Sequence, residues 1–277
     1  MTITILIDNS LGKNTTLSTE HGLSMLIETD ERQHILCDMG ASGKFIENAT
    51  LLGISLNSVD IAFISHGHND HTGGLKDFTE KHPQHTVWLS SHIPHTKYYS
   101  SRHDNKRDIS TDQTLFEKHT NRFNFISTSQ WIAPNIAIVT NKHHLFAKPI
   151  GNKFLSKEEK GSPIVADDFN HELSLAIVSK KGLIIISSCS HEGAINIIKS
   201  CCQFTGESRV DSFIGGLHIV DGENVATETC ILLNELKLHY PNTRIFTGHC
   251  TCNTAKEILS SNNSNIHLFH TGDIICI

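Results

Sequence analysis

The sequence predicts an α/β protein folded as a four-layer αββα sandwich, in which two αβ halves face each other. Strand-like and helix-like segments alternate along nearly all of the 277 residues, and neither proline nor glycine clusters into an interdomain linker. A chain of this length suits one large domain or two small ones. We therefore expect a single domain that covers residues 1–277.

The first half is predicted to contain a strand meander, two helices and further strands. The continuous apolar run 59–64 is typical of a buried strand. Phe45, Ala49 and Leu52 recur on one face of a helix for which Ser42 is the expected cap. The predicted strands are 3–7, 24–29, 35–38, 59–64 and 86–89, and the predicted helices are 42–52 and about 74–81.

The segment from about 90 to 129 is polar, rich in histidine and without clear periodicity. A long segment of this kind can be a lid or a helical insertion over a functional site. Its basic residues Arg102, Lys106 and Arg107 would then serve a substrate. A solvated, charged face explains the same composition equally well.

The second half repeats the alternation of strands and helices. Residues 173–179 and 183–187 are expected to form a hairpin that turns at Lys180-Lys181-Gly182. The remaining predicted strands are 211–214, 244–247, 266–269 and 274–277, and the remaining predicted helices are 193–202, about 226–239 and 254–260.

Composition limits the class of partner. Hydrophobic residues make up 38% and charged residues 19% of the chain, and the net charge is −6, which argues against nucleic acid or a membrane surface as partner. The first residues contain no basic region and read as a strand instead of a signal peptide. The eight cysteines are mostly scattered, as in a reducing compartment. We expect a cytoplasmic protein that acts on a small, anionic molecule; the sequence leaves its oligomeric state open.

The most informative motif is Ser-His-Gly-His-Asn-Asp-His-Thr-Gly-Gly-Leu at residues 65–75. Imidazole and carboxylate groups bind Zn²⁺ and its neighbours in the first transition row. In an extended segment His66 and His68 share a face, and a following helix would turn Asp70 and His71 toward a second point. The motif is therefore a ligand set for two metal ions.

Chance pairs of histidine have to be weighed against this interpretation, because the chain holds 20 histidines. A lone His-x-His pair would be weak evidence. The addition of Asp70 and His71, directly after the buried run 59–64, places the ligands at the end of a strand, where open α/β sheets carry their sites. We expect Gly67 to let the backbone bend and Gly73-Gly74 to allow close packing behind the motif.

Three further histidines follow apolar, strand-like runs in the second half: His191, His218 and His249. One such histidine would usually be a helix cap or a packed side chain, but three at the same sheet edge indicate convergence. His191 and His249 are the expected additional metal ligands. His218, together with Asp70, is an expected catalytic residue.

With these residues in place, the chain resembles the metallo-β-lactamase fold superfamily. His-x-His-x-Asp-His at 66–71 is the signature of that superfamily, and Asp38 in Leu-Cys-Asp-Met-Gly stands where its members have an aspartate that orients the metal-binding loop. One branch is especially similar, through the segments 37–40, 65–75, 189–196, 214–218 and 248–251. That branch includes archaeal proteins named as synthases that join a dihydropterin methyl diphosphate to a ribofuranosyl-aminobenzene phosphate, and many bacterial relatives called metal-dependent hydrolases.

The resemblance implies two mixed β-sheets with the metals between them, and it also includes a departure. Most members have a bridging aspartate after the strand where this chain has Ser188-Cys189-Ser190-His191. Either His191 or a Cys189 thiolate could replace it, since a thiolate is a competent zinc ligand. A buried, inert Cys189 is the plainer alternative. The missing aspartate leaves the occupancy of a second metal position open.

The leading hypothesis is hydrolysis of a small ester, expected to be a phosphoester, by a metal-activated water. Binding to a metal ion lowers the pKa of water from about 15.7 to roughly 7. Asp70 would steer this water, and His218 would protonate the leaving group or hold an anionic substrate. Imidazole-rich ligands favour two divalent ions, with zinc first and Mn or Fe as alternatives. One ion would bind to His66, His68 and His191, and the other to Asp70, His71 and His249.

Two alternatives remain open. A transferase of the synthase kind would use the metals to bind the diphosphate of the pterin substrate. A non-catalytic metal-binding sensor would be favoured by the missing aspartate. Reduction of oxygen or nitric oxide at a di-iron site is disfavoured, because relatives with that chemistry have Glu at the position of His68.

Overall fold

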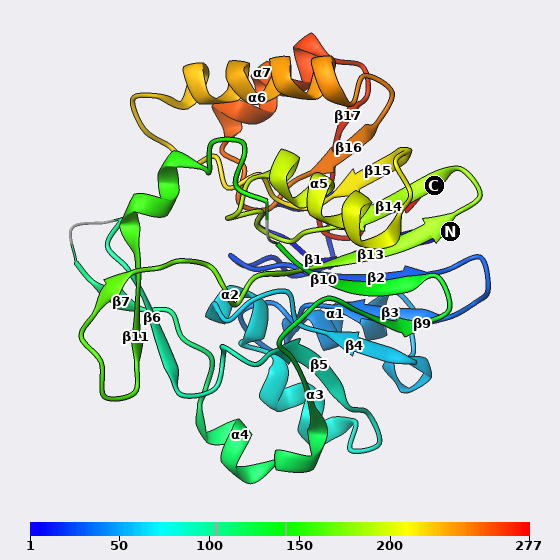
Figure 1. The fold of residues 1–277 in the computed structure, drawn as a ribbon. Helices are drawn as coiled ribbons and strands as arrows, with labels where there is room; N and C mark the ends of the chain where they lie inside the picture. Colours follow the sequence, from blue (N-terminus) through cyan, green and yellow to red (C-terminus); the bar gives the residue numbers. More distant parts are fainter. Residues whose placement is uncertain (103–104, 142) are drawn as a thin grey trace. The chain divides into compact units, whose positions relative to one another are not determined.

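The computed structural model describes residues 1–102, 105–141 and 143–277, which form two compact units. The first unit comprises Met1–Ser127, Leu155–Asp167 and Phe269–Ile277, and the second comprises Thr128–Phe154 and Asp168–Leu268. Each unit has its own seven-stranded sheet and its own helices (Figure 1). The single domain expected from the sequence stays a prediction.

The large sheet of the first unit has the strand order β18-β1-β2-β3-β4-β5-β8. Strands β18, β1, β2 and β3 pair in antiparallel fashion, whereas β3, β4, β5 and β8 pair in parallel. The bounds are β1 Thr2–Ile7, β2 Ser24–Glu28, β3 His34–Cys37, β4 Ile61–Phe63, β5 Val87–Ser90, β8 Phe123–Ile126 and β18 Ile274–Cys276. The predicted strands of this sheet are found, with ends that differ by one or two residues; β8 was not predicted.

Two helices pack on this sheet. Helix α1 (Lys44–Leu51) contributes Phe45 and Ala49 to the core, and α3 (Leu75–Lys81) contributes Phe78. The helix predicted for 42–52 begins two residues later than expected, and the hydroxyl of Ser42 accepts the N–H of Lys44 over 3.3 Å. The shorter helical turns are η1 Leu56–Ser58, α2 Asn69–Thr72, α4 Thr114–Lys118 and η2 Thr120–Arg122.

Part of the predicted lid, residues 90–129, belongs to a small sheet of the first unit. This sheet has the order β12-β11-β6-β7. The hydrophobic pattern missed β6 because the strand buries Thr96, Tyr98 and Ser100, whose hydroxyl groups conceal the alternation. His103 and Asp104 lie outside the described residues. The bounds are β6 Thr96–Ser100, β7 Arg107–Asp108, β11 Leu155–Glu159 and β12 Val165–Ala166.

The sheet of the second unit has the order β17-β16-β15-β14-β13-β10-β9. Strands β14 to β17 pair in parallel, and β9, β10, β13 and β14 pair in antiparallel fashion. The predicted hairpin is the pair β13–β14, whereas β9 and β10 were not predicted. The bounds are β9 Gln130–Ala133, β10 Ile136–Thr140, β13 Leu173–Ser179, β14 Gly182–Ile186, β15 Val210–Ile214, β16 Arg244–Thr247 and β17 Ile266–Leu268.

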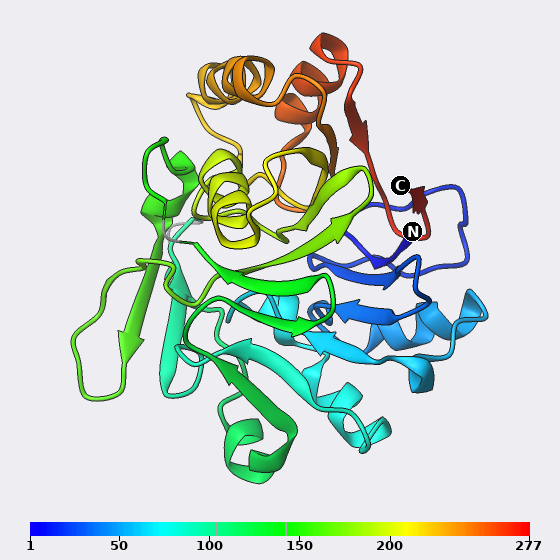
Figure 2. The same ribbon diagram turned by 45° about the vertical axis from the view of Figure 1, so that its right-hand side comes forward.

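Three helices lie on the same side of this second sheet (Figures 1 and 2). They are α5 (Ala194–Thr205), α6 (Val225–His239) and α7 (Asn253–Asn262), and a short turn η3 (Ile150–Phe154) precedes β11. Ile197 and Ile198 of α5 share the core of this unit with strand residues such as Ile185. Each of these helices therefore connects two neighbouring parallel strands of the sheet.

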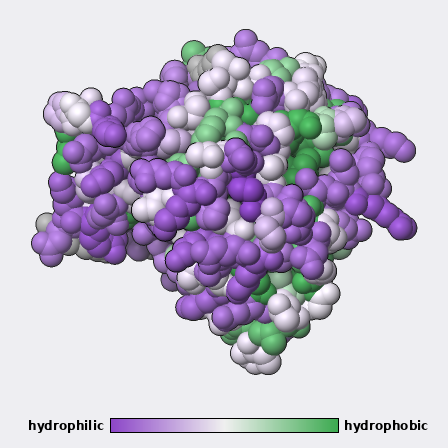
Figure 3. Space-filling view, turned by 90° about the horizontal axis from the view of Figure 1, so that it is seen from below, coloured by the Kyte–Doolittle hydropathy of each residue, from purple (hydrophilic) through white to green (hydrophobic). Residues whose placement is uncertain are grey.

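The distribution of hydrophilic and hydrophobic residues on the surface is that of an ordinary folded protein. In the view of Figure 3 hydrophilic residues dominate, and the hydrophobic ones occur in separate small groups, which is normal for a folded protein. Among the described residues, none of the helices combines the length and the apolar character needed to cross a bilayer.

Candidate metal centre

The motif of residues 65–75 connects β4 to α3 in the first unit. His68 has an extended backbone and directly precedes the single-turn helix α2. The ligand atoms of His66, His68 and Asp70 lie within 4.8 Å of one another, and both histidines are buried. The ring centroids of His66 and His71 are 4.1 Å apart. The local chain path thus brings together the four donors of the motif.

Asp38 determines which nitrogen two of these histidines present. Its carboxylate accepts the N–H and the hydroxyl of Ser65 and the Nδ1–H of His71, each over 2.7 Å. The Ser65 oxygen in turn accepts the Nδ1–H of His66 over 2.8 Å. Because a carboxylate only accepts hydrogen bonds, this relay places the proton on Nδ1 of both rings and leaves both Nε2 atoms as ligands.

His68 is paired with a carboxylate that the sequence did not reveal. Its Nε2 lies 3.6 Å from Oδ2 of Asp167, which is buried and follows β12 directly. No motif marks Asp167, since its position depends on the pairing of β11 with the distant strand β6. Each of the three histidines therefore has a carboxylate behind it, directly or through a hydroxyl, as metal-binding histidines commonly do.

When no cation is bound, the carboxylates around His71 favour its protonated, positively charged form. Burial by itself would lower the pKa of His71, but the carboxylates of Asp70 and Asp38 raise it to about 9. A histidine that binds a metal ion is neutral, so a bound cation takes the place of this proton. The donor set of buried imidazoles beside carboxylates thus fits a divalent cation.

We expect the metal-free protein to lose stability as the pH rises from 6.5 to about 9. A group with a higher pKa in the folded state stabilises the fold fully below its unfolded pKa and loses this contribution as the pH passes through its folded pKa. Urea denaturation of chelator-treated protein across this range measures the effect. Asp70→Asn removes one of the two carboxylates that raise the pKa of His71. It should therefore make the free energy of unfolding fall less steeply with pH. An equally steep fall in both proteins would contradict the assignment to His71.

Glycines behind the motif are required by close contacts. A Cβ on Gly67 would lie 2.6 Å from the ring of Tyr98, and a Cβ on Gly73 would lie 2.1 Å from the carbonyl oxygen of Ala41. The close packing expected at Gly73 is therefore present. The bend expected at Gly67 is also present, and the glycine leaves room for the Tyr98 ring as well.

The segment after β7 is hydrogen-bonded to the metal-binding motif. Ile109 accepts the N–H of Asn69 over 2.7 Å. Thr111 donates its N–H and its hydroxyl to the carbonyl oxygen of Gly67 over 3.2 and 3.0 Å. The basic residue Arg107 stands in β7, two positions before this segment.

In the second unit, His191, His218 and His249 lie on loops that follow the adjacent parallel strands β14, β15 and β16. The first two loops are bound to each other, because Gly216 donates its N–H to Ser188 over 2.8 Å and accepts the hydroxyl of Ser190 over 2.6 Å. The ring centroids of His191 and His218 are 4.2 Å apart. The loops thus gather these histidines at one edge of the sheet.

Two glycines make this approach of the loops possible. A Cβ on Gly216 would lie 2.5 Å from the carbonyl oxygen of His249. Gly215 has a φ of 140°, and a Cβ there would lie 1.8 Å from the carbonyl oxygen of Ser187. Neither contact can be relieved by a side-chain rotation, because both involve backbone atoms.

We expect Gly215→Ala to destabilise the protein by more than about 4 kcal/mol, in the range that backbone strain and overpacking produce. Gly222→Ala is the matched control, since nothing lies within 4 Å of its Cβ position and its φ is not positive. The control should stay within about 0.5 kcal/mol of the original protein. Urea denaturation measures both variants, and similar stabilities for the two would contradict the packing argument.

Backbone strain marks the loops after β3, β14, β15 and β16. One residue other than glycine in each loop has a left-handed backbone: Asp38 with a φ of 59°, Ser190 with 63°, His218 with 47° and Cys250 with 47°. Such conformations cost energy and cluster at functional sites. Strained residues of this kind therefore occur in the loops of Asp38, His191, His218 and His249, although Arg32, His95, Asn135 and Phe169 have a positive φ as well.

A second thiol joins the candidate ligands of the second unit. The Sγ of Cys250 lies 3.2 Å from Nε2 of His249. A hydrogen bond with Cys189 lowers the pKa of the Cys250 thiol well below its usual value; burial opposes this, and His249 and His218 reinforce it. A thiol with a lowered pKa is a competent ligand or nucleophile. The sequence offered only Gly-His-Cys-Thr at 248–251 as a signal for this cysteine.

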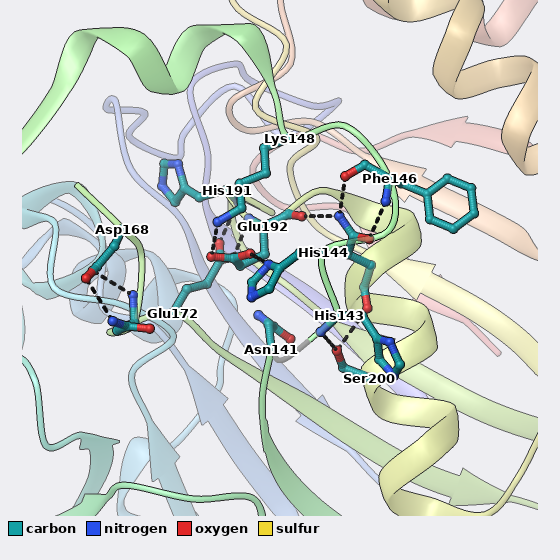
Figure 4. Close-up of polar contacts among 12 residues, drawn as sticks. Asn141, His143, His144, Phe146, Lys148, Asp168, Glu172, His191, Glu192 and Ser200 are labelled. Carbon is teal, nitrogen blue, oxygen red and sulfur yellow. Dashed lines mark hydrogen bonds and ion pairs between the residues drawn. The ribbon is translucent and has the colours of Figure 1, made fainter. Parts of the chain in front are cut away.

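A buried pair of glutamates holds the loop of His191 (Figure 4). Glu172 accepts the N–H of His191 over 2.7 Å and the N–H of Glu192 over 2.9 Å. Glu192 is bound by Lys148 over 2.8 Å and lies 3.1 Å from His144. Burial raises the pKa of Glu172 to about 8, although the two N–H bonds oppose this. The network was missed because nothing in the local sequence links Glu172 to the distant His191.

The second unit also contains a cavity of about 550 Å³ beside this loop. Its walls come from residues 145–150, the start of α5 and the exposed face of α6, and they are mostly apolar. Glu228 is one of its few acidic groups; it accepts the N–H of Ile150 over 2.8 Å, and burial raises its pKa. The cavity suits an apolar or aromatic group.

The chain is similar to proteins of one superfamily over nearly its full length. It is 30% identical to the 7,8-dihydropterin-6-methyl-4-(beta-D-ribofuranosyl)-aminobenzene-5'-phosphate synthase of Methanocaldococcus jannaschii, over 98% of this chain and 94% of that protein. A crystal structure described as a metal-dependent hydrolase of the beta-lactamase superfamily is 26% identical, with a TM-score of 0.81 over 100% of this chain and 99% of that one. The Zn²⁺-bound PqqB of Methylobacterium extorquens shares the fold at 10% identity, with a TM-score of 0.55 over 100% of both chains.

These likenesses confirm the predicted fold class, which is mixed α/β of the metallo-β-lactamase type. The profile of the metallo-beta-lactamase superfamily matches residues 18–172, which include the motif at 66–71. Proteins of this superfamily typically bind divalent metals, and metal-dependent hydrolysis is supported as the general class of activity. The chain therefore belongs to the metallo-beta-lactamase superfamily.

Proposed function

We propose that this protein is a metal-dependent hydrolase of small phosphoesters. The observation that carries the proposal is the buried donor cluster of His66, His68 and Asp70, with Asp38 behind it as the acceptor that fixes the histidine tautomers. A relay of this kind prepares imidazole nitrogens for a cation and has no evident purpose in a plain core.

The proposed ligands come from both halves of the sequence. His66, His68 and His191 would hold one ion, and Asp70, His71 and His249 the other. Zinc is the expected metal because imidazoles dominate the set, with Mn or Fe as alternatives. When bound, such ions supply Lewis acidity and make water more acidic. The thiols of Cys189 and Cys250 are additional candidates in place of the absent bridging aspartate.

The chain's own residues would orient the reactants. Oδ2 of Asp70 lies 3.4 Å from Nε2 of the buried His71 and 3.4 Å from Nε2 of His21, which is exposed. Asp70 can therefore accept a proton from an attacking water that enters from solvent. His218 would protonate the leaving group or bind an anionic substrate. The basic residues near β7 favour a substrate that carries a phosphate, because the segment that follows them is hydrogen-bonded to the metal-binding motif.

Metal analysis followed by a substrate panel tests this proposal. Purified protein should contain zinc, and it should hydrolyse phosphomonoesters or phosphodiesters in preference to thioesters and lactones. A chelator should remove this activity, and added zinc should restore it. Hydrolysis that persists in metal-free protein, or a preference for lactones, would contradict the proposed chemistry.

Transfer is the second candidate, and the 30% identical relative of Methanocaldococcus jannaschii favours it, since that protein is named as a synthase. The mostly apolar cavity of about 550 Å³ has room for a ring-bearing substrate. Product analysis separates the two candidates. Pyrophosphate released from a pterin methyl diphosphate only when an aminobenzene acceptor is present would support transfer, whereas release without the acceptor would support hydrolysis.

A further inference from the structure

The ring of His191 is held by a side chain that no sequence motif indicates. Asn152, in the turn η3, donates its Nδ2–H to the main-chain carbonyl oxygen of His191 over 2.7 Å. Its Oδ1 lies 3.3 Å from Nδ1 of the His191 ring. One carboxamide thus contacts both the backbone and the ring of the same residue.

These two contacts together determine the tautomer of His191. A carbonyl oxygen can only accept, so the amide nitrogen of Asn152 has to face it, and Oδ1 is the atom left for the ring. Oδ1 in turn can only accept, so the ring has to donate from Nδ1. The proton then sits on Nδ1 of His191, and Nε2 carries the lone pair.

Further contacts hold the ring in this orientation. Phe169 is buried and stacks on His191 with ring centroids 4.6 Å apart and an interplanar angle of 7°. Glu172 accepts the main-chain N–H of His191 over 2.7 Å. The residue is therefore fixed at its amide, its carbonyl, its ring nitrogen and its ring face.

The turn that carries Asn152 is itself anchored to the loop of His191. Lys148 binds Glu192 over 2.8 Å, and the side chain of Asn196 bonds to both the N–H and the carbonyl oxygen of Phe146 over 2.9 Å (Figure 4). Gly151 leaves space for His218, because a Cβ there would lie 3.3 Å from its Cε1. Asn152 is thus held in place by contacts that do not involve the ring it orients.

We propose that Asn152 is the positioning residue of His191, which fixes the Nδ1–H tautomer and presents Nε2 to a metal ion. In the first unit, Asp38 and Asp167 stand behind the histidines of the motif. Asn152 does the same in the second unit with a neutral carboxamide, which orients the ring without adding charge. That His191 binds a metal ion rests on the proposed function, whereas the tautomer belongs to the metal-free protein.

The tautomer can be read directly from metal-free protein labelled with ¹⁵N-histidine. Long-range ¹H–¹⁵N spectra at a pH of about 8, above the usual pKa of histidine, distinguish Nδ1–H from Nε2–H rings, and loss of a signal in His191→Gln identifies His191. We expect the Nδ1–H form alone in the original protein and a mixture with Nε2–H in Asn152→Ala. Asn152→Asp keeps an acceptor beside the ring and should retain the Nδ1–H form.

Zinc affinity, measured by competition with a chelating dye, supplies the second readout. Asn152→Ala should bind zinc about 10–100-fold more weakly, as loss of such supporting contacts does, and Asn152→Asp should recover most of the affinity. Asn48→Ala is the matched control: Asn48 is buried and makes three hydrogen bonds, to Leu6 and Ser18, away from the metal motif. Its affinity for zinc should not change.

An Nε2–H ring in the original protein, or an unchanged tautomer and affinity in Asn152→Ala, would overturn the assignment. An equal loss of affinity in Asn48→Ala would also overturn it, because the effect would then be general destabilisation. If the original protein has the Nδ1–H ring and loses it in Asn152→Ala but binds no zinc, the proposed function fails while Asn152 keeps its role as the residue that sets the ring.

Discussion

His68→Ala is expected to reduce phosphoester turnover by about a thousandfold or more while the protein stays folded, because loss of a metal ligand removes several kcal/mol of transition-state stabilisation. The ligand atom of His68 lies within 4.8 Å of those of both His66 and Asp70. Its Nε2 lies 3.6 Å from the buried carboxylate of Asp167, so the substitution leaves that carboxylate buried without this imidazole. Steady-state kinetics and zinc analysis of the same preparation measure the effect.

His82→Ala is the matched control for this substitution. His82 is buried in the first unit, its Nδ1 bonds to Asn57 over 2.9 Å, and it belongs to none of the donor groups. The control should keep its zinc and its turnover even if its melting temperature falls. If His68→Ala keeps full activity, the proposed site is wrong. If neither protein turns over any substrate but both bind the same ligand equally, the sensor hypothesis is favoured.

The parts of the site that the sequence predicted are those that one short segment builds. His66, His68, Asp70 and His71 lie within six positions, so an extended stretch followed by one helical turn is enough to bring them together. His191 and His218 were predicted for a related reason: adjacent parallel strands end at the same edge of a sheet. Both predictions used only residue types and the local sequence pattern around them.

The residues that orient these donors could not be predicted in the same way. Asp167 reaches His68 because β11 pairs with β6, and Asn152 reaches His191 because residues 146–152 are bonded to the start of α5. Such partners are set by contacts between segments far apart in the sequence, and a single Asp or Asn has no pattern of its own. Asp38 was found only through the resemblance to a known family, not through its surroundings in the chain.

Several strands were missed by the sequence prediction for a similar reason. β6 buries hydroxyl residues, and β7 and β12 have two residues each, too short for any periodicity to register. In β10 the residues Ile136–Val139 are all buried, a pattern that a short apolar run does not distinguish from a helix. The predicted fold class was therefore right, whereas the predicted set of strands was incomplete.

Asp38→Ala is expected to lower both zinc affinity and stability. The substitution leaves the N–H of Ser65 and the Nδ1–H of His71 buried without their acceptor, and breaking a buried charged pair of this kind costs about 3–5 kcal/mol. Zinc affinity should fall by about 10–100-fold. Urea denaturation of the metal-free protein and competition with a chelating dye measure the two effects.

Asp38→Asn separates the direction of the hydrogen bonds from the space that the side chain fills. A carboxamide has one acceptor oxygen, so its nitrogen has to face one of the donors that Asp38 now satisfies. If that nitrogen donates to the Ser65 oxygen, the Ser65 hydroxyl has to donate to Nδ1 of His66 instead. The His66 ring then carries its proton on Nε2, which is the atom needed to bind a cation. We therefore expect Asp38→Asn to lose less stability than Asp38→Ala but a comparable part of the zinc affinity. Asp60→Asn is the control, because Asp60 accepts a main-chain N–H from His34 on an exposed edge. Zinc binding by Asp38→Asn as tight as in this control would mean that the relay from Asp38 does not set the ligand tautomers.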